Sequence, residues 1–337
     1  MNALVPHPVA AIRDEIRRRR RFLISSHARP DGDSIGSQLA MACALRALGK
    51  DVRIVNRDAP PEHYYEFPGV DGITISDRVD PAWGAFDAEI IMECGDLKRT
   101  GVEGLGQSFV INIDHHVGNT SFGAINWFDE SASACGELVF LIIEELGVEL
   151  TPEIATHIYL AILTDTGSFH HSNITPRTFE ICRKVTEAGV NPASMARRVF
   201  DSNSLGKLKL IGSLLDSMEM HDHGRLAAIC LTQEMLDRAD STLNDTEGLI
   251  NLPLTAREIQ AVVFFKSLEP GLVRVSMRSK YDVDVRAVAV QYGGGGHKNA
   301  AGFSVAGQIA GVREPIIEKL LAEIWRAGKR GREPVSP

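Results

Sequence analysis

The sequence lacks any long apolar run. None of its hydrophobic stretches approaches the ~20 residues that a membrane-spanning helix needs. The first eleven residues also lack the basic-then-apolar order of a signal peptide. We therefore expect a cytoplasmic protein with no membrane partner.

Cysteine is also scarce, and acidic residues outnumber basic ones. The five cysteines of the 337-residue chain are scattered, without a C-x-x-C pair. This usage is typical of reduced, mostly buried thiols in the cytoplasm. The formal net charge of −8 argues against binding along duplex nucleic acid, which requires a broad basic face. It leaves room for a small, locally basic pocket.

The first half of the chain alternates strand and helix signals. Short apolar runs lie at residues 21–26, 51–56, 88–94 and 108–113, and helical patterns cover 34–49, 134–147, 151–165 and 175–189. Glycines follow three of these helical patterns, and Thr-Pro pairs begin two of them. The alternation predicts an α/β domain with a mainly parallel sheet flanked by helices.

The second half has a different pattern. Residues 191–222 are fairly polar and helical in character, which predicts a connector between two domains. Strand-like runs follow at 225–231, 258–268 and 272–280, then a helix at 283–292, a glycine run, a short strand and a final helix at 312–328. We expect a catalytic domain (1–190), a helical connector (191–222), a smaller α+β domain (223–328) and a disordered tail (329–337).

Carboxylates and imidazoles follow four apolar runs of the first half. They are His27, Asp31 and Asp33, then Asp96, then Asp114, His115 and His116, and finally Asp165. Each alone has an ordinary explanation, such as a helix cap for Asp33. Together they would meet at the carboxyl edge of a parallel sheet, where sites gather.

Carboxylates crowded in this way need cations. Like charges at close range raise one another's pKa and destabilise a fold unless they are neutralised. Carboxylates and imidazoles without a thiolate suit Mn²⁺ or Mg²⁺, and two such ions ~3.5–4 Å apart are the usual device for activating water against phosphorus. The residues therefore predict a two-metal site.

The motifs that carry these residues resemble those of a known family. H-x-x-x-D-x-D from His27, the later Asp96, D-H-H from Asp114 and L-T-D-T-G-S-F from 163 resemble, in order, the four motifs of the DHH phosphoesterases. GGGGHKNAAG at 293–302 resembles the glycine-rich loop of the DHH-associated (DHHA1) C-terminal domain. The two-domain layout is similar to the nanoRNase/pAp phosphatase branch (NrnA type). One departure is Glu93, where relatives often have Asp; it is not among the usual ligands.

The resemblance implies a role for each motif residue. His27 and Asp31 would hold one ion, Asp33, His115 and Asp165 the other, and Asp96 would bridge both. A water activated by the two ions would be the nucleophile. His116 would face the scissile phosphate as a catalytic residue. Asp114 would take part in catalysis or, in a reading that we slightly favour, accept a hydrogen bond that orients a histidine.

We expect basic side chains and glycine backbone groups to bind the rest of the substrate. Backbone N–H groups of Gly294, Gly295 and Gly296 would approach a phosphate closely, and His297, Arg278 and Arg99 would add donors and charge. For Arg278 and Arg99, a solvated surface position is an equally good interpretation. For the arginine run 17–21 we prefer a solvated helix end, favoured by the helix dipole.

These expectations define a function. The protein would be a hydrolase with two Mn²⁺ ions, or Mg²⁺, that acts on short single-stranded RNA and on 3′-phosphoadenosine 5′-phosphate (pAp). Two alternative functions are open. One is a phosphodiesterase of cyclic or linear dinucleotides (c-di-AMP, pApA), and the other is a non-catalytic nucleotide-binding module. The family resemblance also implies a homodimer.

Overall fold

The computed structural model describes residues 8–201, 203–246 and 248–330. The chain divides into two compact units, one up to residue 202 and one from residue 203 onward. None of the helices within the described ranges is both long and apolar enough to cross a membrane.

The first unit alternates strands with helices, as the sequence predicts. It contains α1 (Pro8–Arg18), β1 (Arg21–Ser25), α2 (Gly32–Ala47), β2 (Asp51–Asn56), β3 (Thr74–Ile75), β4 (Ala88–Met92), β5 (Phe109–Asp114), β6 (Ile125–Phe128), α3 (Cys135–Leu146), α4 (Pro152–Asp165), α5 (Pro176–Glu187) and α6 (Pro192–Phe200). Short 3-10 helices lie in the loops, among them η1 (Glu62–Glu66), η3 (Pro81–Trp83) and η4 (Leu97–Thr100).

All six strands of this unit pair in parallel, in the order β3-β2-β1-β4-β5-β6. The order reverses between β1 and β4, because β2 and β3 are added on one side of β1 and β4, β5 and β6 are added on its other side. In open α/β sheets, ligands bind beyond the carboxyl ends of the strands at this reversal point. The expected parallel sheet is confirmed, and its topology marks the place for a site.

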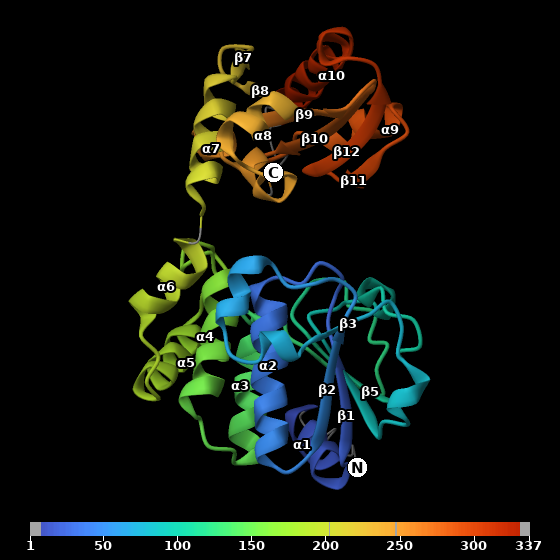
Figure 1. Ribbon diagram of the computed structural model, residues 1–337, viewed down its shortest axis with the longest axis vertical. Coiled ribbons are helices and arrows are strands. Elements are labelled where there is room, and N and C mark those ends of the chain that lie inside the picture. Colours follow the sequence, from blue (N-terminus) through green and yellow to red (C-terminus); the bar gives the residue numbers. More distant parts are fainter. Residues whose placement is uncertain (1–7, 202, 247, 331–337) are drawn as a thin grey trace, which may run out of the picture. The chain divides into compact units, whose positions relative to one another are not determined.

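The two faces of the sheet are covered differently. Along β1, Phe22 and Ile24 enter a large core shared with α1 to α6, whereas Leu23 enters a smaller cluster on the opposite face. This alternation follows from the two-residue period of a strand. The smaller cluster is closed by loops and 3-10 helices, including Trp83 of η3. Figure 1 shows α2, α3 and α4 standing side by side against the sheet.

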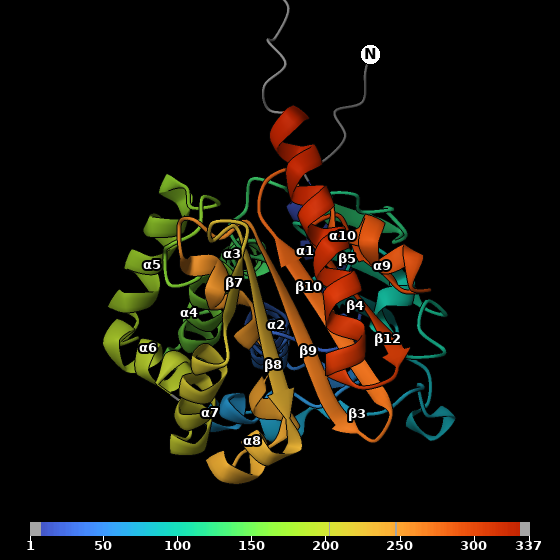
Figure 2. The same cartoon turned by 90° about the horizontal axis from the view of Figure 1, so that it is seen from above.

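The second unit is an α+β structure. It contains α7 (Leu205–Asp216), β7 (Glu219–His221), β8 (Leu226–Thr232), α8 (Gln233–Ala239), β9 (Ala261–Glu269), β10 (Leu272–Ser279), α9 (Val285–Gln291), β11 (Gly295–His297), β12 (Ala300–Ala306) and α10 (Ile309–Arg330). Its sheet has the order β11-β12-β10-β9-β8-β7, and among the described strands only the β8–β9 pair is parallel. Helices α9 and α10 cover one face, and Figure 2 shows α10 lying across the strands. Helices α7 and α8 pack on the other face, against β8 and β9.

Three expected segments differ in detail from the structure. Residues 191–222 form two helices, α6 in the first unit and α7 in the second, and end in strand β7. Lys329 and Arg330, assigned to the tail, are the last residues of α10, and 331–337 lie outside the described residues. In the arginine run, Arg19 pairs with Glu15 and Arg21 with Asp51, so these two are not free surface charges.

Candidate active site

The site residues come from three neighbouring strands and two helices. His27 lies shortly after β1, Glu93 directly follows β4, and Asp114 is the last residue of β5. The carboxyl ends of parallel strands share one edge of the sheet, and β1 and β4 flank the reversal point. Asp33 lies in the first turn of α2, and Asp165 ends α4. The fold therefore gathers groups that are more than 130 residues apart in sequence.

One group consists of Asp33, His115 and Asp165. His115 Nε2 lies 3.7 Å from Asp33 Oδ2 and 3.6 Å from Asp165 Oδ2. Asp33 is 1% exposed, and its carboxylate accepts hydrogen bonds from the backbone N–H groups of Cys135 (2.6 Å) and Gly136 (3.0 Å) at the start of α3. The N-terminus of α3 thus holds the Asp33 carboxylate in place, as helix N-termini do for anions.

Glu93 is the centre of a second group, with His115 and His116. It is 1% exposed. Its backbone has a positive φ of 57°, a conformation that is uncommon for residues other than glycine and that is found most often at functional sites. Its Oε1 lies 2.8 Å from His115 Nε2, and its Oε2 lies 3.1 Å from His116 Nδ1. Glu93 was not among the metal ligands expected from the sequence, but in the structure its carboxylate lies between the imidazoles of His115 and His116.

The tautomer of His115 shows what this arrangement requires. Its Nδ1 donates to the carbonyl oxygen of Ala132 at 3.0 Å, because a carbonyl can only accept. Its Nε2 therefore faces the carboxylates of Asp33, Glu93 and Asp165. Within the described residues, His115 Nε2 and both Glu93 oxygens are buried without a partner in hydrogen-bonding geometry. A proton or a metal cation must lie between such atoms.

The pKa values express the crowding of charge. Burial first, and then the charge of Glu93, raises the pKa of Asp33 well above its usual range and raises that of Asp165 to about 6. Burial would lower the pKa of His115, but its contact with Glu93 outweighs this and raises the pKa to about 10. Burial would likewise raise the pKa of Glu93, but the two imidazoles lower it. These opposed shifts reflect carboxylates and imidazoles that are packed against one another away from solvent.

Asp114 orients His116. Asp114 is fully buried, and its Oδ1 accepts from His116 Nδ1 at 3.0 Å and from the backbone N–H of His115 at 2.9 Å. Its Oδ2 accepts from Asn119 at 2.7 Å. The contacts with Asp114 and Glu93 raise the pKa of His116 to about 10. Because both carboxylates contact Nδ1, His116 Nε2 faces away from them.

His27 and Asp31 form the third part of the cluster. His27 Nδ1 donates to the carbonyl oxygen of Ala28 at 2.9 Å, and its Nε2 lies 2.8 Å from the hydroxyl of Ser34 and 3.7 Å from Asp31 Oδ2. Asp31 is also the N-cap of α2. Burial would lower the pKa of His27 and raise that of Asp31, but the contact between the two groups outweighs burial, so the pKa of His27 is raised and that of Asp31 is lowered. The charge of Glu93 raises the pKa of both groups. Glu93 therefore acts electrostatically on both halves of the cluster.

Asp96 and Arg99 lie differently from the expectation. Asp96 is half-buried and caps η4, and its Oδ1 accepts from the backbone N–H of Lys98 at 2.8 Å. It belongs to neither of the potential metal-binding groups that the described residues form at this edge. Glu93, the first residue after β4, contacts His115 and His116 at this edge, whereas Asp96 contacts neither imidazole in the described structure. Arg99 follows in η4 with an exposed side chain.

The donor set of this cluster fits divalent metal ions. It consists of carboxylate oxygens and imidazole nitrogens without a thiolate, which is the set that suits Mn²⁺ or Mg²⁺. The unpartnered atoms of Glu93 and His115 converge, as expected for ligands of a shared cation. A cavity of about 340 Å³ opens beside Asp31 and Asp165 and is also lined by Tyr64 and Phe200.

The second unit presents a basic row on its sheet. Arg278 of β10 pairs with Ala300 of β12, and Ala300 pairs with His297 of β11. Residues directly opposite one another point to the same face, so Arg278 and His297 share one face, about 9–10 Å apart across two strand spacings. Ala300, which is small, lies between them.

The glycine run is partly explained by close packing. A Cβ on Gly294 would lie 2.3 Å from the carbonyl oxygen of Gly302, and one on Gly296 would lie 2.4 Å from that of Ala300. Gly296 also has a φ of 136°. A Cβ on Gly295 would meet nothing within 4 Å. Since β11 is an edge strand, the backbone groups on its outer side are not used by the sheet.

Comparisons with known proteins agree with both units. Residues 21–162 match the DHH family, N-terminal domain, and residues 228–327 match the DHHA1 domain. The bifunctional oligoribonuclease and PAP phosphatase NrnA of Thermus thermophilus is 33% identical over 307 residues, which are 90% of each chain. The chain belongs to the DHH family.

Other relatives extend this assignment of a DHH-family phosphoesterase. The NrnA protein of Bacillus subtilis, with the same description, is 26% identical over 84% of this chain and 89% of its own. Among solved structures, an exopolyphosphatase-related protein from Bacteroides fragilis has a TM-score of 0.82 at 24% identity, covering 96% of this chain and 98% of its own. That structure supports the fold alone.

Proposed function

We propose that this protein hydrolyses short oligoribonucleotides to mononucleotides and pAp to AMP in a metal-dependent reaction. The observation that carries the proposal is the set of buried, unpartnered atoms of Glu93 and His115 at the reversal point of the sheet. The substrates follow from the NrnA relatives, which share most of their length with this chain. Mn²⁺ is the proposed ion, with Mg²⁺ as a second choice, because of the oxygen-rich donor set.

The ligand set that we propose modifies the sequence expectation at one position. Asp33, His115 and Asp165 would hold one ion, and His27 and Asp31 would hold the other, as the motif order implies. Glu93 would serve as a ligand in the place that the sequence assigned to Asp96. Two divalent ions in such a site supply Lewis-acid chemistry, since they polarise a phosphoryl oxygen and lower the pKa of water.

His116 is the residue that we assign to the substrate phosphate. Asp114 and Glu93 hold its Nδ1, so the ring is oriented with Nε2 facing away from them. A charged imidazole held in this way can donate to a phosphate oxygen as negative charge develops. Asp114 itself is a positioning residue in this proposal, because Asn119 and two backbone N–H groups already occupy its oxygens.

The second phosphate, or the remainder of the substrate, is assigned to Arg278, His297 and the Gly294–Gly296 segment. Arg278 and His297 are two basic side chains on one face of the second sheet. The N–H group of Gly294 already donates to the carbonyl oxygen of Ala289 at 3.0 Å, so Gly294 would contribute through its lack of a side chain. The backbone of edge strand β11 would supply N–H groups near Gly295, where a Cβ would meet nothing within 4 Å. Arg99 is an additional candidate. A dimeric state and a cytoplasmic location remain predictions.

A turnover comparison tests this function. The purified full chain is assayed with Mn²⁺ on pAp, pApA, c-di-AMP, a ribodinucleotide and a long single-stranded RNA. We expect pAp and the dinucleotide to be hydrolysed fastest and the long strand slowest. Preference for c-di-AMP would favour the cyclic-dinucleotide alternative. Nucleotide binding without turnover of any of these substrates would favour the non-catalytic module.

A further inference from the structure

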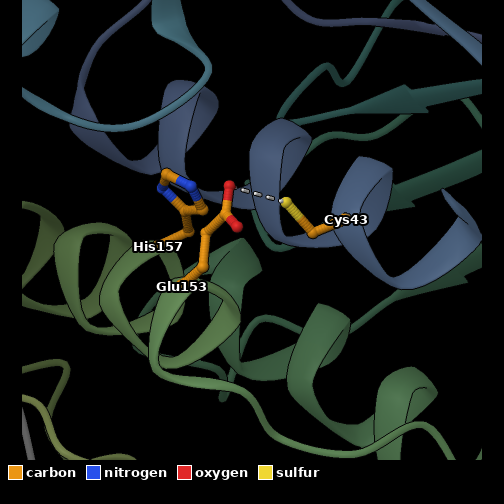
Figure 3. A group of neighbouring side chains, drawn as sticks. All are labelled: Cys43, Glu153 and His157. Carbon is orange, nitrogen blue, oxygen red and sulfur yellow. Dashed lines mark hydrogen bonds between the residues drawn. The ribbon is translucent and has the colours of Figure 1, made fainter. Parts of the chain in front are cut away.

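Three potential metal ligands meet at the opposite end of the helix pair that supports the active site. They are Cys43 of α2 and Glu153 and His157 of α4, and their ligand atoms all lie within 4.8 Å of one another. Figure 3 shows the three side chains converging between the two helices. Glu153 and His157 are four residues apart, so they lie on the same face of α4.

This group is separate from the acidic cluster, the name we use for the candidate active-site residues Asp33, Glu93, His115 and Asp165 with their neighbours. Helix α2 carries Asp33 in its first turn and Cys43 ten residues later, which corresponds to about 15 Å along the helix axis. Helix α4 runs the other way, with Glu153 in its first turn and Asp165 at its end. The two groups therefore occupy opposite ends of one antiparallel helix pair.

His157 is the observation that points to a ligand. Its side chain is 0% exposed, and neither ring nitrogen has a hydrogen-bond partner among the described residues. Buried polar groups are almost always paired, so an imidazole with two unpaired nitrogens requires an explanation. Burial first, and then the charge of Arg198, lowers the pKa of His157 to about 4. The ring is therefore neutral, the form that binds metal.

The other two groups complete a mixed donor set. The Cys43 thiol is half-buried and donates to Glu153 Oε1 at 3.5 Å, and Glu153 reaches the surface. One sulfur, one nitrogen and one oxygen ligand, completed by a water, would form a set that Zn²⁺ accepts. A thiolate ligand disfavours Mn²⁺ and Mg²⁺, so this group would select a different ion from the acidic cluster.

We propose that Cys43, Glu153 and His157 form a second metal site, which binds a zinc-type divalent ion and links α2 to α4. Binding would transfer the Cys43 proton to solvent as the sulfur–metal bond forms. One ring nitrogen of His157, the Cys43 sulfur and one Glu153 carboxylate oxygen would hold the ion. It would stabilise the helix pair whose other end carries Asp33 and Asp165.

Cobalt substitution tests the site independently of hydrolysis. Metal-free full-length protein is titrated with Co²⁺, and the thiolate-to-cobalt charge-transfer absorption is recorded together with bound metal per chain. The acidic cluster supplies no thiolate ligand, so this absorption reports the proposed site. The variants are Cys43→Ser and Glu153→Gln, both at partly or fully exposed positions. Cys182→Ser is the matched control, since Cys182 is also a half-buried thiol packed on the same core.

We expect the absorption in the wild type and in Cys182→Ser, its loss in Cys43→Ser, and at least tenfold weaker binding in Glu153→Gln. Saturated wild type should hold one more ion per chain than Cys43→Ser. A hundredfold excess of Zn²⁺ over Kd should raise the wild-type Tm by about 5–10 °C more than that of Cys43→Ser. The proposal is overturned if the wild type lacks the absorption, if Cys43→Ser retains it, or if Glu153→Gln binds as tightly as the wild type.

Discussion

Replacing Glu93 by Gln should remove the main source of metal affinity in the acidic cluster. Glu93 is 1% exposed and lies 2.8 Å from His115 Nε2 and 3.1 Å from His116 Nδ1. Gln keeps the size of the side chain and removes its charge. Loss of one partner from a buried charge pair costs about 3–5 kcal/mol. At 1.4 kcal/mol for each factor of ten, Mn²⁺ should therefore bind roughly 100- to 5,000-fold more weakly.

Asp96→Asn is the matched control for this change. It also removes one carboxylate charge, three residues further along the chain. The Asp96 side chain caps η4 through the backbone N–H of Lys98, and Asn is an equally good cap. The Asp96→Asn protein should thus bind Mn²⁺ as the wild type does and keep its turnover of pAp.

Calorimetric titration of metal-free protein with Mn²⁺ measures both affinities, and kcat/KM on pAp under subsaturating Mn²⁺ provides the second readout. Circular dichroism melts establish that each variant is folded. If Asp96→Asn weakens Mn²⁺ binding as much as Glu93→Gln, or more, then Asp96 is the bridging ligand that the motif order predicts. Our assignment of Glu93 would then be wrong.

Three further outcomes follow from particular contacts. Gly36→Ala should destabilise the first unit by about 1–3 kcal/mol, because the new methyl group would lie 2.5 Å from the carbonyl oxygen of His157. The control is Gly212→Ala, whose methyl group would meet nothing within 4 Å and should raise the Tm slightly. His297→Ala should leave Mn²⁺ content unchanged and lower kcat/KM on pAp roughly 10- to 200-fold, the value of a hydrogen bond to a charged group; an equal loss on bis(p-nitrophenyl) phosphate would place His297 at the reacting centre. Chelation by EDTA should abolish hydrolysis and Mn²⁺ should restore it, whereas restoration by Zn²⁺ alone would contradict the proposed hard-ligand site.

The local elements were predictable because their signals are local. Thr151 and Thr175 cap α4 and α5 with a proline in the next position, and Gly147 ends α3 in the left-handed conformation. These choices act within one helical turn, so they are visible in the sequence. The apolar runs likewise became strands, since a strand buried on both faces needs little else.

The membership of the acidic cluster was predictable only in part. Five of its residues lie just after a strand or at the end of a helix, and a parallel sheet brings such positions to one edge. They are His27, Asp31, Asp33, His115 and Asp165. The choice between Glu93 and Asp96 was not visible, because both acidic residues follow the same strand. The structure separates them, since Glu93 is the first residue after β4 whereas Asp96 is the N-cap of η4.

The amino-acid sequence by itself determined the alternation of strands and helices, the helix ends and the residue types available for metal binding. Tertiary structure alone decided which of these residues meet. Arg278 and His297 share a face because of the register of three strands. Cys43 and His157 are brought together by the packing of α2 on α4. Pairings of this kind depend on contacts between segments that are distant in the chain, and local propensity carries no information about them.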